Sequence, residues 1–303
     1  MKNQKYLVTI IGPTGIGKTS TSIALAKEFQ SEIISADSRQ FYKEMQIGTA
    51  VPNEKELTEV PHHFIQHISI NQDYNVGDFE SDALQLLKEK FKNHDILFMV
   101  GGSGLYIDAV LKGLDTFPKV NSQVRLDLQK LFLESGIEAL QEKLKLLDPE
   151  YYEKVDKNNA HRLIRALEIC IGTNKPYTSF LGKKNAGRNF TPIKIGLSAE
   201  REIIYNRINN RVNLMIENGL INEVKNLNNK KHLNALQTVG YTEMFAHLEG
   251  VITFEKAVEE IKKNSRRYAK RQLTWWRKDE SIKWFEYDDK IENIINYIKL
   301  KTS

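Results

Sequence analysis

Residues 6–19 read Tyr6-Leu7-Val8-Thr9-Ile10-Ile11-Gly12-Pro13-Thr14-Gly15-Ile16-Gly17-Lys18-Thr19. The first six residues are mostly apolar and β-branched, which is typical of a buried parallel strand. The last eight fit the pattern G-x-x-x-x-G-K-[ST], in which backbone N–H groups surround a phosphate. Residues 20–29 have the pattern of a helix, whose N-terminus would add positive charge. Together these features predict a polyphosphate site, without saying whether the ligand is a nucleotide.

Two side chains would complete this loop. Lys18 supplies a full positive charge, and the Thr19 hydroxyl is suited to hold Mg²⁺. An ATPase or GTPase usually has an acid at the end of a second strand to help hold the metal. The best buried strand here, 96–100, ends instead in Gly101-Gly102. The missing acid argues against a nucleotide hydrolase and against a kinase.

Further predicted strands alternate with helical patterns, which favours an α/β fold with a parallel sheet. The strands are 33–36, 96–100, 193–197 and an edge-like 282–285, and the most evident helices are 78–92 and 200–227. Ligands of such sheets bind beyond the carboxyl ends of the strands. The phosphate loop, Asp37 and Gly101-Gly102 all follow strands, so we expect them to meet in one crevice.

Asp37 is the one acidic residue of this predicted crevice. A carboxylate that faces a phosphate site suits a general base or a hydrogen-bond acceptor for a nucleophile. The same residue could simply cap the next turn. The residues around Asp37 favour neither role over the other.

About 90 residues separate the strands 96–100 and 193–197, too many for a simple crossover. Helical patterns at 122–135, 136–147 and 159–171 occupy this stretch. We therefore expect a P-loop NTPase-like core of residues 1–115 and 191–303, with a helical insertion domain of residues 116–190. Arg162 and Arg165 share one face of the third helix, where a solvated basic face is the simpler interpretation and a phosphate contact the alternative.

Basic residues concentrate near the C-terminus. The chain of 303 residues has a formal net charge of +5, yet residues 261–278 alone carry eight cations and no anion. Cations alternate there with aromatic residues, as in Lys270, Arg271, Trp275, Trp276 and Arg277. This composition suits a nucleic-acid surface, although inward-packed tryptophans and solvated cations would give the same pattern.

Other features bound the environment of the protein. A single cysteine, Cys170, excludes an internal disulfide and fits a reducing cytoplasm. We find no signal peptide before the first strand and no apolar run of the roughly 20 residues that a membrane span needs. A monomer without an obligate protein partner is the default expectation. We interpret His62, His63 and His67 as loop residues, because a metal site would need a further ligand.

Eight segments of the chain, in the same order, match motifs of one family. They are GPTGIGKT at 12–19, ISADSRQFYKEMQIGTAVP at 34–52, VGDFESDA at 76–83, VGGSGLYIDAVLKGL at 100–114, HRLIRALEI at 161–169, the stretch 206–219, TVGYTEM at 238–244 and AKRQLTWWRK at 269–278. On these motifs the chain resembles the tRNA dimethylallyltransferases, also called tRNA isopentenyltransferases. The phosphate loop is common to many families, whereas the second, fourth and last segments are much more specific.

The resemblance implies a reaction. Members of the family transfer a dimethylallyl group from dimethylallyl diphosphate to the N6 amine of an adenosine. That adenosine lies 3′ of the anticodon in tRNAs that read codons beginning with U. The phosphate loop, 12–19, would bind the diphosphate, with Mg²⁺ on Thr19, so that ATP becomes the weaker candidate ligand. Asp37 would accept the proton of the attacking amine, and Arg211 matches an arginine tied to catalysis, although Arg207 lies one turn away.

The resemblance also implies contacts with the anticodon stem-loop of tRNA, which would lie between the core and the insertion. The positions that match are Asp37, Ser38, Arg39, Gln40, Ser103, Arg125, His161, Arg162, Leu163, Ile164 and Arg165. This favours RNA contact over a solvated face for Arg162 and Arg165. The alternatives are a P-loop kinase of small molecules, an RNA-binding regulator without chemistry, and a prenyltransferase that acts on free AMP. Asp37 argues against a pure binder, and the insertion and the basic stretch argue against AMP.

Overall fold

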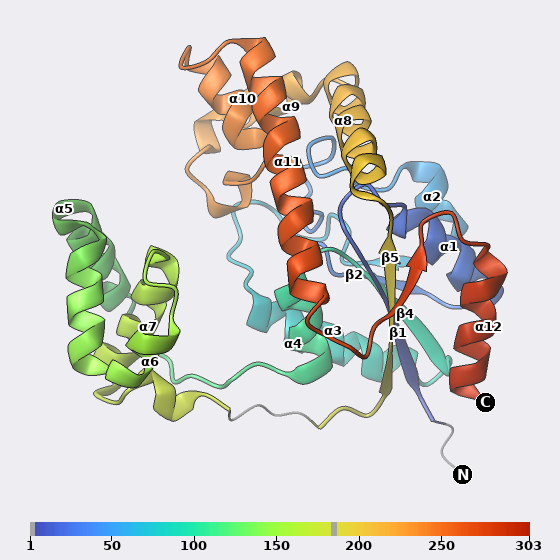
Figure 1. Cartoon of the computed structure of the whole chain (residues 1–303), viewed down its shortest axis with the longest axis horizontal. Helices are drawn as coiled ribbons and strands as arrows, with labels where there is room; N and C mark the ends of the chain where they lie inside the picture. The colour runs from blue at the N-terminus through green and yellow to red at the C-terminus, as the bar shows by residue number, and fades with distance from the viewer. Residues whose placement is uncertain (1–3, 183–186) are drawn as a thin grey trace. The chain divides into compact units, whose positions relative to one another are not determined.

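A parallel sheet of six strands is found in the computed structural model, which describes residues 4–182 and 187–303 (Figure 1). The strands are β1 Tyr6–Ile11, β2 Ile33–Ser35, β3 His62–His63, β4 Ile96–Val100, β5 Thr191–Ser198 and β6 Lys283–Glu286. Their order across the sheet is β3-β2-β4-β1-β5-β6, and every neighbouring pair is parallel. The predicted α/β class is confirmed, and β6 is an edge strand as expected.

The strand that precedes the phosphate loop is buried on both faces. Leu7 and Ile11 of β1 belong to one apolar core and Val8 and Ile10 to another, because successive side chains point to opposite faces. Helices α3 and α4 contribute to the first core, and α1, α8 and α12 to the second. The helices packed around the sheet are α1 Lys18–Glu28, α2 Glu54–Glu59, α3 Val76–Lys90, α4 Gly104–Lys112, α8 Arg201–Glu217, α9 Leu220–Asn226, α10 Tyr241–Leu248, α11 Phe254–Trp276 and α12 Ile291–Thr302.

The chain divides into two compact units. The first comprises Met1–Leu111 and Arg188–Ser303 and holds the sheet, and the second comprises Lys112–Gly187. The boundaries lie a few residues before those that the sequence analysis placed. Two segments lie outside the described residues: residues 1–3, which belong to the predicted core, and residues 183–186, which belong to the predicted insertion.

The second unit is helical and has its own core. Its helices are α5 Ser122–Leu147, α6 Pro149–Lys154 and α7 Ala160–Thr173. The expected break between two helices lies inside α5, where Gly136 leaves the helical conformation at φ 76° and ψ −174°. The buried Asp148 carboxylate accepts hydrogen bonds from the backbone N–H groups of Tyr151 and Thr178, and so ties the start of α6 to the segment after α7.

Two predictions about local structure were wrong, and several helices were not predicted. The predicted helix 200–227 is two helices, because Gly219 adopts φ 92° between α8 and α9. His62 and His63 form the short edge strand β3 rather than a loop, held by pairing with β2. The helices that the sequence analysis did not name are α2, α4, α6, α10 and α12. Within the described part of the chain, none of the helices combines the length and the apolar character that a membrane span needs.

Candidate functional site

Two adjoining cavities open in the first unit at the carboxyl ends of the strands. We call the larger, of about 690 Å³, the wide cavity and the smaller, of about 470 Å³, the loop cavity. Lys18 and Thr19 line the loop cavity, and Ser38 and Ser103 line the wide one. The residues that line both are Thr14, Asp37, Arg211, Tyr268 and Gln272. The predicted crevice therefore exists, and Asp37 lies where its two parts meet.

The loop before α1 has the backbone of a phosphate site. Gly12, Gly15 and Gly17 have φ values of 147°, 81° and 110°, which side-chain-bearing residues rarely adopt. A Cβ on Gly12 would also lie 2.6 Å from the carbonyl oxygen of Leu197 on β5. Helix α1 begins at Lys18, so the positive end of its dipole faces the loop cavity. The expected strand, loop and helix are thus all present.

Lys18 bonds to its own loop. Its ammonium donates to the carbonyl oxygens of Pro13 at 2.8 Å and Gly12 at 3.0 Å. Burial lowers the pKa of Lys18 to about 8, with the nearby Asp37 opposing the shift and the cationic Arg211 adding to it. The three charged groups therefore interact across one site.

Two other residues of the loop already have protein partners. The backbone N–H of Thr14 donates to the side-chain Oε1 of Gln272 at 2.9 Å. The Ile16 side chain is buried in the core beneath the loop, so only its backbone can face a ligand. Of the predicted binding residues, Thr14 thus has its backbone N–H already bonded, and Ile16 can contact a ligand only through its backbone.

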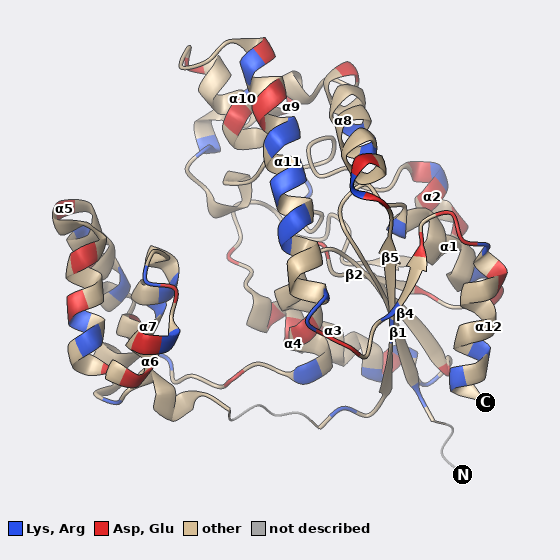
Figure 2. Cartoon of the chain, in the orientation of Figure 1, with Lys and Arg blue, Asp and Glu red and all other residues tan. Residues whose placement is uncertain are grey.

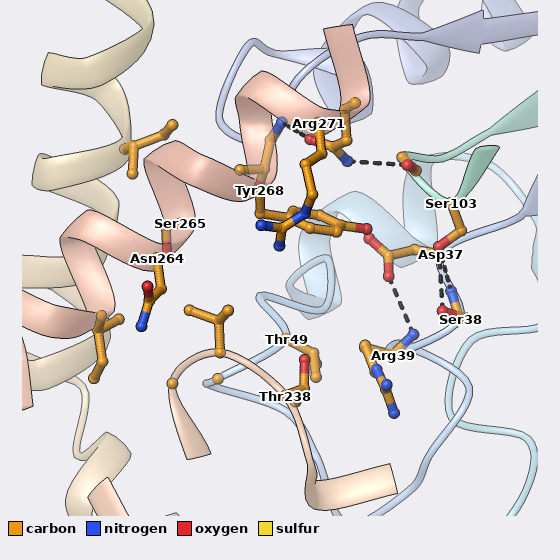
Figure 3. A pocket seen from close by; sticks show the side chains of 18 of the residues that line it. Asp37, Ser38, Arg39, Thr49, Ser103, Thr238, Asn264, Ser265, Tyr268 and Arg271 are labelled. Carbon is orange, nitrogen blue, oxygen red and sulfur yellow. Dashed lines mark hydrogen bonds between the residues drawn. The ribbon is translucent and has the colours of Figure 1, made fainter. Parts of the chain in front are cut away.

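Asp37 caps a turn and also lines the crevice. Its Oδ1 accepts the backbone N–H of Arg39 at 3.1 Å, and its carbonyl accepts the N–H of Gln40 at 3.0 Å, so it caps a turn. The same carboxylate lines both cavities. Figure 3 shows it beside the hydroxyl end of Tyr268. Burial, reinforced by the negative Asp37, raises the pKa of Tyr268 to about 12.

Ser38 and Ser103 meet next to Asp37. The backbone N–H of Ser38 donates to the Ser103 hydroxyl at 3.2 Å, and the two hydroxyl oxygens are also 3.2 Å apart (Figure 3). The structure thus brings together two predicted site residues that follow different strands, β2 and β4. Their hydroxyl groups lie at the wall of the wide cavity.

Arg39 and Gln40 use their side chains to hold neighbouring loops. The Arg39 guanidinium donates to the carbonyls of residues 234–235 at 3.0 and 3.1 Å. The Gln40 amide donates to the carbonyls of residues 49–50 at 3.2 and 3.0 Å. Arg39 lines the wide cavity and Gln40 the loop cavity.

The two candidate arginines of α8 have different surroundings. Arg211 lines both cavities; burial lowers its pKa, while the negative charge of Asp37 opposes this shift. Arg207 donates to the Gly15 carbonyl at 2.7 Å, and its guanidinium lies 5.3 Å from the Tyr287 ring. Arg211 donates to the Thr49 carbonyl at 3.5 Å and lines the same two cavities as Asp37, whereas Arg207 holds the phosphate loop.

The remaining predicted RNA-contacting residues lie in the second unit. Glu168 of α7 is buried and accepts hydrogen bonds from Arg165 at 3.0 Å and Arg125 at 3.2 Å. Both arginine side chains keep roughly two fifths of their surface exposed. Leu163 and Ile164, by contrast, are buried in the core of this unit. Their predicted RNA contact cannot involve the side chains in this conformation. His161 and Arg162 are exposed at the start of α7.

The basic stretch lies on α11 and the turn after it, and Figure 2 shows its cations along that helix. Its two neighbouring tryptophans differ in exposure. Trp276 is buried, as in a packed helix, whereas Trp275 is 42% exposed and lines the wide cavity. The Trp275 indole N–H donates to Asp108 at 3.0 Å, which fixes the ring.

Sequence reasoning missed Tyr268 and Gln272, although both line the two cavities. They are four residues apart and therefore share a face of α11. The sequence prediction for this stretch rested on its lysines, arginines and tryptophans, and neither Tyr268 nor Gln272 is one of these. The histidines, in turn, are occupied elsewhere: His63 bonds to Glu32 at 2.5 Å, and His67 packs against the Phe41 ring. Within residues 4–182 and 187–303, no three His, Cys, Asp or Glu side chains are grouped to hold a metal ion.

Comparison with known proteins gives a consistent set of similarities. The sequence model described as IPP transferase matches residues 40–279. A protein named tRNA dimethylallyltransferase from Christiangramia forsetii is 60% identical over 98% of this chain and 98% of its own length. The crystal structure of the full-length tRNA isopentenylpyrophosphate transferase from Bacillus halodurans is 39% identical, with a TM-score of 0.74 over 99% of this chain and 97% of that one. A eukaryotic dimethylallyltransferase acting on tRNA is 26% identical, with a TM-score of 0.80 over 94% of this chain and 75% of that one.

Proposed function

The chain belongs to the IPP transferase family, and we propose from this premise that it transfers a dimethylallyl group from dimethylallyl diphosphate to tRNA. The enzyme is a transferase. The acceptor is the N6 amine of the adenosine 3′ of the anticodon in tRNAs that read codons beginning with U, and diphosphate is released. One observation carries the proposal beyond family membership: a single carboxylate, Asp37, lines both the loop cavity and the wide cavity.

The loop cavity suits the diphosphate of the donor. Lys18, Arg211 and the N-terminus of α1 all place positive charge there. As the bond between the allylic carbon and oxygen breaks, negative charge grows on the diphosphate, and these groups stabilise it. Removing one such donor typically costs about 2.7–4 kcal/mol of transition-state stabilisation.

The side chains present also fit a magnesium ion. Mg²⁺ prefers oxygen ligands and keeps several waters, so one or two protein oxygens beside a diphosphate are sufficient. The Thr19 hydroxyl and the Asp37 carboxylate line the same cavity as Lys18. We assign Thr19 as the protein ligand. The ion would supply additional positive charge against the leaving diphosphate.

The wide cavity suits the adenine. Asp37 accepts a hydrogen bond and then the proton from N6, while a bond forms between N6 and the allylic carbon and the carbon–oxygen bond of the donor breaks. The proton passes from Asp37 to water when the product leaves. The lone pair of N6 is delocalised into the ring, so orientation by the cavity supplies much of the rate. The base must leave its stack to enter, which costs a few kcal/mol.

The second unit is assigned to the anticodon stem-loop. Arg162 is exposed on it, and Arg125 and Arg165 keep roughly two fifths of their side-chain surface exposed. Glu168 pre-orients the last two for phosphate oxygens. In the first unit, Ser38, Ser103 and Arg39 line the cavity that would receive the base and its neighbours. We further propose that the enzyme acts as a monomer in the cytoplasm.

The test is direct. The protein is incubated with unmodified tRNA, Mg²⁺ and dimethylallyl diphosphate, and the nucleosides are then analysed by mass. We expect one adenosine per tRNA to gain a dimethylallyl group. If no adenosine gains mass, the proposed function is wrong. Free AMP serves as a second acceptor, and modification of AMP in place of tRNA would favour the small-molecule alternative.

A further inference from the structure

The side chain of Gln272 joins three segments that are far apart in the sequence. It lies on α11 and is 5% exposed. Its Oε1 accepts the backbone N–H of Thr14 in the phosphate loop at 2.9 Å, and its Nε2 donates to the carbonyl of Gly102 after β4 at 3.0 Å. A buried amide that is bonded at both ends is held in one orientation, because either flipped or displaced positions leave buried polar groups unpaired.

Gly102 leaves the space that this bridge needs. A Cβ at that position would lie 2.1 Å from the Gln272 Nε2. Real side chains do not approach so closely, so any larger residue at position 102 would displace the amide. The bridge thus depends on a residue without a side chain as well as on the glutamine.

Helix α11 connects the bridge to the wide cavity. Tyr268, Arg271 and Trp275 extend from the same helix and line that cavity, while Gln272 lines both cavities. A ligand that contacts these side chains and fits one position of α11 better than others would favour that position. Hydrogen bonds weaken over a few tenths of an ångström, so a shift of the helix alters the hold on Thr14. Thr14 directly follows Pro13, whose carbonyl holds the Lys18 ammonium.

We propose that Gln272 is a positioning residue that couples the occupancy of the two cavities. RNA in the wide cavity holds α11, Gln272 holds the N–H of Thr14, and the phosphate loop is thereby kept in the conformation that binds diphosphate. The coupling is reciprocal, because each ligand changes the affinity for the other by the same factor. The identity of the ligands rests on the proposed function, whereas the bridge itself does not.

The first experiment measures the coupling. The affinity of inorganic diphosphate with Mg²⁺ is determined by calorimetry, with and without an anticodon stem-loop RNA. In the native protein we expect RNA to raise this affinity by about fivefold or more. In Gln272→Met, which keeps the length of the side chain but lacks the amide, the factor falls to near one. Thr274→Ala, an exposed change on the same helix, keeps the native factor. An undiminished factor in Gln272→Met, or no coupling in the native protein, overturns the proposal.

The second experiment tests the bridge without any ligand. Melting temperatures are measured for Gly102→Ala, Gln272→Ala and the double variant. We expect Gly102→Ala alone to lower the melting temperature by about 4 °C or more, and to have less than half that effect when Gln272 is already alanine. Additive effects would show that the two residues do not share one packed site. If the native protein modifies tRNA but shows no coupling, the coupling role of Gln272 is wrong and the proposed function stands. If the two substitutions have non-additive effects but the protein never modifies tRNA, the bridge stands and the proposed function is wrong.

Discussion

The Nζ of Lys18 lies 2.8 Å from the carbonyl oxygen of Pro13, so the lysine of the phosphate loop bonds to the loop that presents it. A second bond to the Gly12 carbonyl, at 3.0 Å, completes the arrangement. Carbonyl oxygens carry only partial charge, and the oxygens of a diphosphate are stronger acceptors for an ammonium group. Diphosphate, if bound as we propose, would therefore replace two weak partners by stronger ones without moving the lysine into solvent.

This arrangement predicts how diphosphate binding depends on pH. Because burial lowers the pKa of Lys18 to about 8, the side chain is charged below that pH and neutral above it. We expect the affinity for diphosphate to fall by up to about tenfold per pH unit above 8. Calorimetry between about pH 7 and pH 9.5 measures this. In Lys18→Arg the charge persists, so the decline should disappear; a decline that remains would assign it to another group.

Asp37 should be needed for transfer and dispensable for diphosphate binding. Asn at this position can still accept the N–H of Arg39 and cap the turn, but it cannot take a proton. We expect Asp37→Asn to lower the single-turnover rate by about 10²–10⁴-fold while the affinity for diphosphate changes little. Asp37→Ala, which also loses the cap, separates the effect on folding from the effect on chemistry. If the rate of Asp37→Asn is close to that of the native enzyme, Asp37 is not the general base.

Arg162 and Arg165 should contribute to RNA affinity through phosphate. Replacing either by Gln should weaken tRNA binding. It should also make the negative slope of log affinity against log salt shallower, by up to about 0.7–0.9 per lost contact. The slope is obtained from filter binding at several salt concentrations. Lys154, an exposed cation of the same unit that pairs with Glu150, is the matched control. Equal slopes for Lys154→Gln and the arginine variants would show that neither arginine contacts phosphate, and would favour the interpretation of a solvated basic face.

Glu223 should stabilise the loop that supports Gln40. Its carboxylate accepts the backbone N–H groups of residues 46–48 at 2.7 to 3.0 Å and the hydroxyl of the buried Tyr241 at 2.6 Å. We expect Glu223→Gln to lower the free energy of unfolding by about 2–3 kcal/mol, since several bonds to a charged acceptor are weakened. Tyr241→Phe removes one of these bonds and should cost less, about 1–2 kcal/mol. Urea unfolding measures both. A larger loss in Tyr241→Phe than in Glu223→Gln would contradict this order.

Local chemistry explains why parts of the fold could be predicted. The strand Tyr6–Ile11, the glycines of the phosphate loop and the helix after Lys18 are encoded by neighbours in the chain. The break between α8 and α9 could have been predicted from Gly219 alone. It was not predicted because the residues on both sides of the glycine continue one helical pattern. Strand β3 has two residues and exists only because β2 lies beside it. No local pattern could reveal it.

Local sequence thus decided the strand, the loop, the helix and the identity of the charged groups, because these depend on the conformations that adjacent residues permit. Family motifs added the expected chemistry. Tertiary structure alone decided which groups meet: Arg211 lines both cavities together with Asp37 while Arg207 holds Gly15, and Gln272 on α11 reaches both Thr14 and Gly102. Such pairings join residues up to 258 positions apart. They arise from packing around the sheet, which brings distant side chains within the few ångströms over which hydrogen bonds and burial act.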